Sequence, residues 1–264
     1  MKKHIKIIVY FFLTLLFFGG VIWALQFAHR QHSQRTYEHV RIFIDAQNGY
    51  VFITENEIIE QLASANLHPE RETTRLNTYI IERFLQQNTA IQDVNVFTQI
   101  SGEVDIRVLQ RQPIVRVENA QRQHFFIGSD GGLMALTPNH TARLLIASGH
   151  IFEPFRANKN VVESAVDVPS ERATLYKIYQ LATYIRNDDF LSALISQIYV
   201  NSRNEFELVS NVRNQIILLG RAENFEDQFR RLHHFYHHAI RKVDINAYRT
   251  INLKFDNQLI GTRI

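Results

Sequence analysis

Residues 91–115 read IQDVNVFTQISGEVDIRVLQRQPIV, and this stretch decides the fold of the first part of the chain. It contains two segments in which apolar and polar residues alternate, and Ser101-Gly102 separates them. Alternation with a period of two predicts strands, and the Ser-Gly pair predicts a hairpin turn between them. One face of the second strand carries Val104, Ile106 and Val108, and the other carries Glu103, Asp105, Arg107 and Gln110. We therefore expect one face of this sheet to meet water and the other to pack against helices.

The residues before this hairpin supply the other elements of the same unit. The sequence HVRIFID at 39–45 alternates as a strand. The segment TENEIIEQLASANL at 54–67 has Thr54 as N-cap and Glu57 three residues later, which is the spacing of a capping box and predicts an amphipathic helix. A second helix is predicted over 76–87. The order strand, helix, helix, strand, strand predicts a small α+β domain at 38–111.

Further upstream, residues 7–28 form an uncharged apolar run, IIVYFFLTLLFFGGVIWALQFA. As a helix these about 22 residues span roughly 33 Å, which is enough for a bilayer core. A cleaved signal peptide is the alternative, but the run exceeds an ordinary signal core and no small-x-small site follows Trp23. We predict a transmembrane helix at 7–28, a tail at 1–6 and a linker at 29–37. Lysines at 2, 3 and 6 favour a cytoplasmic N-terminus and an exported remainder.

Downstream, residues 112–264 are predicted to form a β-rich domain with helical inserts. The predicted strands are 113–118, 124–127, 133–136, 143–147, 197–201, 205–209 and 215–219. The predicted helices are 170–188, with Ser170 as N-cap, and 223–243. Pro113 marks the boundary between the domains, because the residue before a proline favours extended backbone. The predicted fold class is therefore α+β, with a transmembrane helix, a β-α-α-β-β domain and a β-rich domain.

Composition excludes several classes of function. The chain has 264 residues, of which 45% are hydrophobic and 21% charged, so we expect it to be mostly folded. The formal net charge of +3 comes from basic residues spread along the chain, with no basic run beyond HRQHSQR at 29–35, and nucleic-acid binding is not indicated. No cysteine is present, which excludes disulfides, thiol nucleophiles and cysteine-ligated zinc.

Two motifs suggest chemistry but are better explained as structure. The sequence HHFYHH places His233 with His237, and His234 with His238, at i,i+4 spacing, which could hold a metal through two imidazoles. No glutamate follows the first histidine as general base, so a solvated helix face with at most adventitious metal binding is preferred. The glycines of IGSDGGLM at 127–134 lack the spacing of a phosphate loop and predict a hairpin turn. We predict no enzyme, cofactor, metal site or small-molecule substrate.

The order of these parts resembles the FtsQ/DivIB family of bacterial cell-division proteins. The segment AIQDVNVFTQISGEVDIRVLQRQPIVRV at 90–117 resembles the family's POTRA domain and its Arg-x-Pro step, here Arg111 and Pro113. The segments FFIGSDGGLMAL at 125–136 and RLLIASGHI at 143–151 resemble the hairpin and strand that follow. The chain's last segment, INLKFDNQLIGTRI at 251–264, resembles the family's terminal strands. The resemblance covers nearly the whole region after the apolar run.

The terminal strands are the candidate binding site. Ile251, Leu253 and Phe255 alternate with polar residues, and Leu259 and Ile260 follow a predicted turn at Asp256-Asn257. Little charge blunts this strand, so we expect its edge to accept a partner strand. The resemblance implies FtsB-like and FtsL-like membrane proteins as partners, with Lys254 contacting an acidic side chain and Phe255 as aromatic anchor. The predicted partner-binding residues are Ile251, Leu253, Lys254, Phe255, Leu259 and Ile260.

The resemblance implies a scaffold of the division machinery, held in the inner membrane at the septum and recruiting FtsB-like, FtsL-like and other divisome proteins for septum formation. Two alternatives remain open. A membrane-anchored POTRA module could act in protein secretion or outer-membrane assembly. An exported metalloenzyme could use the histidines at 233, 234, 237 and 238.

Overall fold

The computed structural model describes residues 16–21, 23, 39–46, 51–67, 77–99, 103–136, 144–165, 173–239, 247–256 and 258–263. Residues 16–21 and 23 are helical, and the rest of the predicted 7–28 span lies outside the described residues. Among the described residues, no helix is long and apolar enough to cross a membrane. The hairpin turn predicted at Ser101-Gly102 also lies outside them.

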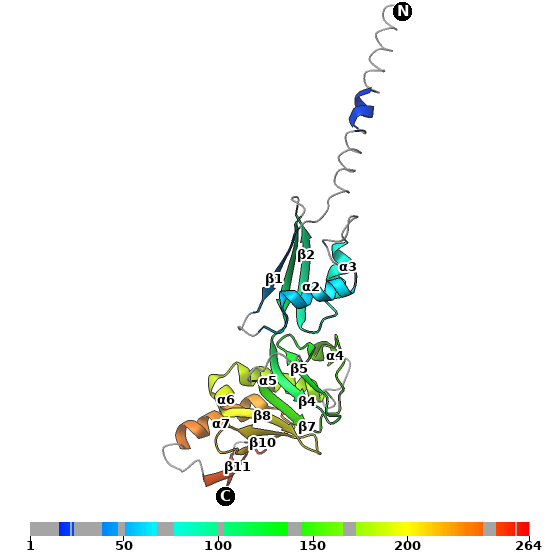
Figure 1. Cartoon of the computed structure of the whole chain (residues 1–264). Helices are drawn as coiled ribbons and strands as arrows, with labels where there is room; N and C mark the ends of the chain where they lie inside the picture. Colours follow the sequence, from blue (N-terminus) through cyan, green and yellow to red (C-terminus); the bar gives the residue numbers. More distant parts are fainter. Residues whose placement is uncertain are drawn as a thin grey trace, which may run out of the picture. The chain divides into compact units, whose positions relative to one another are not determined.

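The chain is of mixed α+β class and forms two compact units (Figure 1). The first unit comprises 1–43, 55–85 and 94–107, and the second comprises 44–54, 86–93 and 108–264. The predicted order of strand, helix, helix, strand, strand is confirmed at 39–110. The elements are β1 (His39–Asp45), α2 (Glu55–Ser64), α3 (Thr78–Leu85), β2 (Ile91–Thr98) and β3 (Glu103–Gln110). The three strands form a sheet in the order β1-β3-β2.

The apolar face of this small sheet packs against α2 and α3, as predicted. Val104, Ile106 and Val108 are buried together with Ile58 and Leu62 of α2 and Ile81 and Leu85 of α3.

Two polar residues of β3 that are predicted to meet water are buried, and the second, Gln110, lies two residues after Val108 on the apolar face. Asp105 is only 6% exposed, because its carboxylate accepts hydrogen bonds from Arg41 Nε (2.9 Å) and Gln99 Nε2 (2.7 Å). These donors lower the pKa of Asp105, with the Arg41 hydrogen bond as the largest cause. Gln110 is fully buried, and its Oε1 accepts from the backbone nitrogens of Phe52 (2.6 Å) and Ile53 (3.3 Å).

The β-rich domain contains a nine-stranded sheet in the order β12-β11-β10-β9-β8-β7-β4-β5-β6. The strands are β4 (Pro113–Glu118), β5 (His124–Gly128), β6 (Leu133–Ala135), β7 (Leu145–Gly149), β8 (Ile195–Val200), β9 (Phe206–Ser210), β10 (Ile216–Gly220), β11 (Tyr248–Asn252) and β12 (Ile260–Arg263). All seven strands predicted between 113 and 219 are present, within a few residues of the expected bounds.

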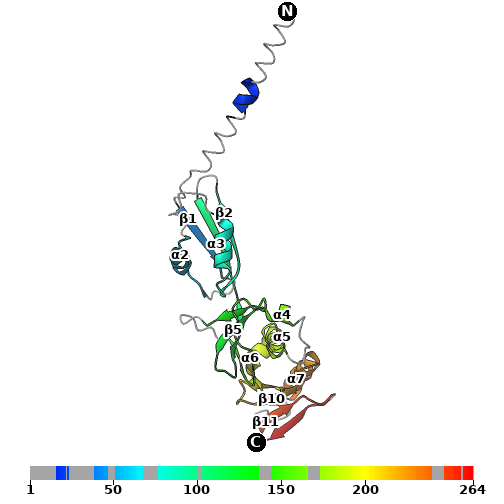
Figure 2. The ribbon, with the colours of Figure 1, turned by 90° about the vertical axis from the view of Figure 1, so that its right-hand side faces the viewer.

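Helices lie in the connections of two of the three parallel pairs in this sheet, β7 with β8 and β10 with β11. The helices α4 (Val161–Ser164), α5 (Thr174–Arg186) and α6 (Asp189–Leu194) lie between β7 and β8, and α7 (Phe225–Ala239) lies between β10 and β11. Parallel neighbours need such crossover connections, and Figure 2 shows α5, α6 and α7 grouped beside the strands. Their apolar residues share one core with alternate strand residues. The predicted inner face of α5 is buried, whereas its N-cap is Ala173 and not Ser170.

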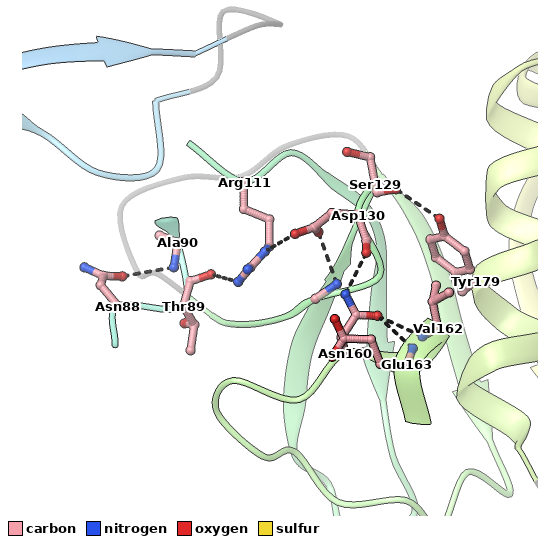
Figure 3. A network of polar contacts seen from close by, with 11 residues as sticks. Asn88, Thr89, Ala90, Arg111, Ser129, Asp130, Asn160, Val162, Glu163 and Tyr179 are labelled. Atoms are coloured by element: carbon pink, nitrogen blue, oxygen red, sulfur yellow. Dashed lines mark hydrogen bonds and ion pairs between the residues drawn. The ribbon is translucent and has the colours of Figure 1, made fainter. Parts of the chain in front are cut away.

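The segment IGSDGGLM is a hairpin turn between β5 and β6, as predicted. Two of its glycines leave space for the side chain of Arg111, which reaches from Thr89 to Asp130 in Figure 3. A Cβ on Gly128 would lie 2.6 Å from Arg111 Cγ, and one on Gly132 would lie 2.6 Å from Arg111 Cζ and Nε. Arg111 Nε donates to Asp130 Oδ2 (3.0 Å), and its Nη1 donates to the carbonyl of Thr89. The glycines of this turn therefore allow the side chain of Arg111 to pack against its backbone.

Candidate functional site at the terminal strands

The two ends of the nine-stranded sheet differ in how they are covered. At one end, β6 donates from Leu133 N to the carbonyl of Lys159 (2.9 Å) and from Ala135 N to Thr89 Oγ1 (3.0 Å). At the other end lies β12, which has β11 as its single neighbouring strand in the described part of the chain (Figure 2). An unpaired strand edge is a template for pairing with another chain, so β12 is the candidate binding edge.

The helix α7 holds β11 and the following turn in place. Gln228, which is buried, donates from Nε2 to the carbonyls of Leu219 (2.8 Å) and Leu253 (3.1 Å), and so joins β10 to the segment after β11. Tyr236 Oη donates to Gln215 Oε1 (2.8 Å), and Gln215 Nε2 donates to the carbonyl of Tyr248 (2.7 Å). Burial raises the pKa of the Tyr236 hydroxyl above its ordinary value, so burial favours the protonated form that donates this hydrogen bond.

A single arginine of α7 holds the turn between β11 and β12. Arg231 Nη1 donates to the carbonyls of Phe255 (2.7 Å) and Gln258 (2.8 Å), and Nη2 donates to the carbonyl of Leu253 (3.2 Å). Its Nε donates to Asp227 (3.0 Å). The planar guanidinium suits this arrangement, because it directs several donors at fixed angles. Sequence reasoning did not find Arg231, since no local pattern indicates that a helix residue reaches a turn more than twenty positions away.

The five apolar residues among the six predicted partner-binding residues differ in exposure. Ile251 and Leu253 are 0% exposed and lie in the core, whereas Leu259 is half-buried against that core. Phe255 is 46% exposed and Ile260 is 43% exposed. In this conformation the side chains of Ile251 and Leu253 are not accessible to a partner. The exposed apolar surface near the edge therefore comes from Phe255 and Ile260.

Lys254 has a partner within the same chain. Its Nζ donates to Glu205 Oε2 at 2.6 Å, and both side chains are about a quarter exposed, at 29% and 21%. The hydrogen bond from Lys254 is the largest cause that lowers the pKa of Glu205. A carboxylate of a partner would therefore share or replace Glu205 at this ammonium group.

The four histidines of α7 pack in two pairs, with the imidazole rings of each pair in contact. The ring centroids of His233 and His237 lie 4.7 Å apart, and those of His234 and His238 lie 4.0 Å apart and are stacked. Phe190 contacts His233 edge-to-face at 4.6 Å. Among the described residues, no group of three or more histidine, cysteine, aspartate or glutamate side chains is arranged to hold a metal ion.

A family model described as FtsQ/DivIB, C-terminal related, matches residues 112–262. The chain belongs to the FtsQ/DivIB family. A model of the POTRA-like domain matches residues 36–109, which contain the three-stranded sheet and its two helices. No curated protein matches the chain. Both matches agree with the resemblance drawn from the sequence, and the C-terminal match favours a role in cell division over one in secretion.

Proposed function

We propose that the protein is a non-catalytic scaffold of the bacterial division machinery and that it recruits FtsB-like and FtsL-like membrane proteins through the edge of β12. The family supports the division role, and the open edge of β12 is the observation that supports the mode of binding. A partner strand would add to β12 through backbone hydrogen bonds, while exposed side chains such as Phe255 and Ile260 would give specificity.

The proposal includes a membrane anchor at 7–28, a cytoplasmic N-terminus and an exported remainder at the septum. It also places the boundary between a POTRA-like domain and a β-domain at 111/112. The apolar composition of 7–28 supports the anchor. Confinement of scaffold and partner to one membrane raises their effective concentration, so a short strand pairing can suffice for binding.

The test introduces lysine at the edge, because natural proteins use charged side chains to block edge pairing. Ile260→Lys is compared with Ile146→Lys, since both isoleucines are 43% exposed and lie on strands of the same sheet. The full chain is purified from crosslinked cells, and the FtsB-like partner is quantified. We expect about tenfold less partner with Ile260→Lys, which corresponds to a loss of about 1.4 kcal/mol of binding free energy, and little change with Ile146→Lys.

Protease resistance and circular dichroism confirm that both variants fold. Equal partner recovery from the two variants would refute edge pairing at β12. For Lys254, Lys254→Met is more informative than Lys254→Glu, because a new carboxylate would lie beside Glu205 and repel it.

A further inference from the structure

An aromatic ring of β11 lies directly against a glycine of β12. A Cβ on Gly261 would lie 2.6 Å from Cδ1 and 2.7 Å from Cε1 of Tyr248, so the tyrosine ring occupies the space of a side chain at this position. The same ring meets Phe235 of α7 edge-to-face, with centroids 6.4 Å apart. The half-exposed Tyr248 is thus fixed between α7 and the edge strand.

Gly261 and Arg263 lie on the same face of β12. Gly261 pairs with Ile251, whose side chain is buried in the core, so this face of the strand points toward α7. Arg263 follows two residues later and therefore points the same way. Its guanidinium lies 5.7 Å from the ring centroid of Tyr248. On this face, β12 presents an aromatic ring and then a positive charge to any strand that pairs with it.

The spacing in a sheet determines which side chains of an added strand would meet these groups. Side chains directly opposite each other have Cβ atoms about 4.5–5.5 Å apart. Because Gly261 has no Cβ, the residue opposite it would reach the ring of Tyr248. The residue opposite Arg263 would lie beside a guanidinium, for which a carboxylate is the strongest partner. A basic residue there would be repelled.

We propose that Tyr248 selects the partner strand, which carries an apolar side chain opposite Gly261 and a carboxylate opposite Arg263. This inference rests on the proposed function and defines the chemistry of the partner. Tyr248 lies outside the six residues predicted from the sequence, and its role depends on the pairing of β11 with β12.

The experiment uses a fused strand as the probe, so that no natural partner is needed. The full chain is extended after Ile264 by an Asn-Gly turn and a strand that folds back on β12, since this dipeptide favours two-residue hairpins. The first version places leucine opposite Gly261 and glutamate opposite Arg263. The second replaces the leucine by serine, and the third replaces the glutamate by lysine. Hydrogen exchange of the β12 amides reports pairing, and that of β8 and β9 confirms the fold.

We expect the leucine-glutamate strand to slow β12 exchange about threefold to tenfold more than either other strand, the range expected for one aromatic contact. Tyr248→Ala should abolish the preference for leucine, Tyr248→Phe should retain it, and the exposed Phe152→Ala should leave it unchanged. A preference that survives Tyr248→Ala would overturn the inference. If all three strands slow exchange equally, β12 accepts strands without selection by Tyr248, and only the inference fails. If none slows exchange, edge pairing and the proposed function fail as well.

Discussion

At the residue scale, two glycines of the turn between β5 and β6 leave space for the side chain of Arg111. At Gly128 the aliphatic part of Arg111 fills the space where a Cβ would lie, and at Gly132 its guanidinium does so. A residue with a side chain would clash at either position. Arg111 is 13% exposed and its partner Asp130 is 21% exposed, so their ion pair is largely shielded from water. Such a pair is costly to break from one side, because the remaining charge stays buried.

Gly132→Ala is therefore expected to lower the free energy of unfolding by about 1–3 kcal/mol, the usual cost of forcing extra atoms into a packed site. Denaturant unfolding of the variant measures this loss. The control is the same substitution in an Arg111→Ala background, where the space is free and the cost should fall below about 0.5 kcal/mol. Equal costs in the two backgrounds would show that the glycine serves another purpose.

The pair of Lys254 and Glu205 gives a prediction about pH. The pKa of Glu205 is lowered in the folded protein, so the pair contributes stability above the pKa of the carboxyl group in the unfolded chain. The contribution is lost as the pH falls through the lower pKa of the folded state. At neutral pH, Lys254→Met should cost at most about 1 kcal/mol, because the pair is partly exposed. Thermal unfolding at several pH values should show the difference disappearing in acid, and a difference that is constant with pH would contradict this.

At the scale of elements, α7 organises the terminal strands. Its side chains contact β10, β11 and the turn before β12, and it is the crossover that makes β10 and β11 parallel neighbours. A crossover helix packs on one face of the sheet and leaves the edge strand's outer edge open. The helix thus supports the candidate binding edge without covering it.

Arg231→Met should release the turn between β11 and β12, because three carbonyls lose a charged donor. A hydrogen bond to a charged group contributes about 1.5–3 kcal/mol to the free energy of unfolding. We expect faster hydrogen exchange in β12 and weaker partner recovery. Arg230→Met is the matched control, since Arg230 is the preceding residue, is 78% exposed and bonds to Asp227. Equal exchange rates in both variants would argue against a role of Arg231 in holding the turn.

At the scale of the whole molecule, two short segments before residue 112 belong to the same compact unit as the nine-stranded sheet. Residues 44–54 and 86–93 cluster with the nine-stranded sheet. Phe52 packs edge-to-face on Phe126 with centroids 6.0 Å apart, and Thr89 bonds to both Arg111 and Ala135. A β-domain that begins at 112 lacks all of these contacts.

We therefore expect a fragment of residues 112–264 to be less stable than residues 38–264 by about 2 kcal/mol or more, the combined cost of an aromatic contact and two hydrogen bonds. For a chain of this size, that lowers the melting temperature by several degrees. A fragment that begins at residue 86 keeps Thr89 and Arg111 and should be intermediate. Identical melting of the β-region in all three fragments would show that the boundary at 111/112 separates independent folding units.

The sequence alone determined the elements and their order. Alternation in IQDVNVFT and EVDIRVLQ predicts strands whatever surrounds them, because side chains on a strand alternate between its two faces, and the buried faces of α5 and α7 follow from the helical period in the same way. These patterns depend on near neighbours in the chain. The family resemblance also rests on local segments and their order, and it is confirmed.

Only the tertiary structure decided which side chains of the terminal strands remain exposed. The sequence treats Ile251, Leu253 and Ile260 alike, but the pairing of β11 with β10 and the packing of α7 bury the first two. The burial of Gln110, the packing of Arg111 on Gly132 and the position of the half-buried Tyr248 ring beside Gly261 likewise depend on residues far away in the sequence. Such contacts arise from strand register and helix packing, and no local period encodes them.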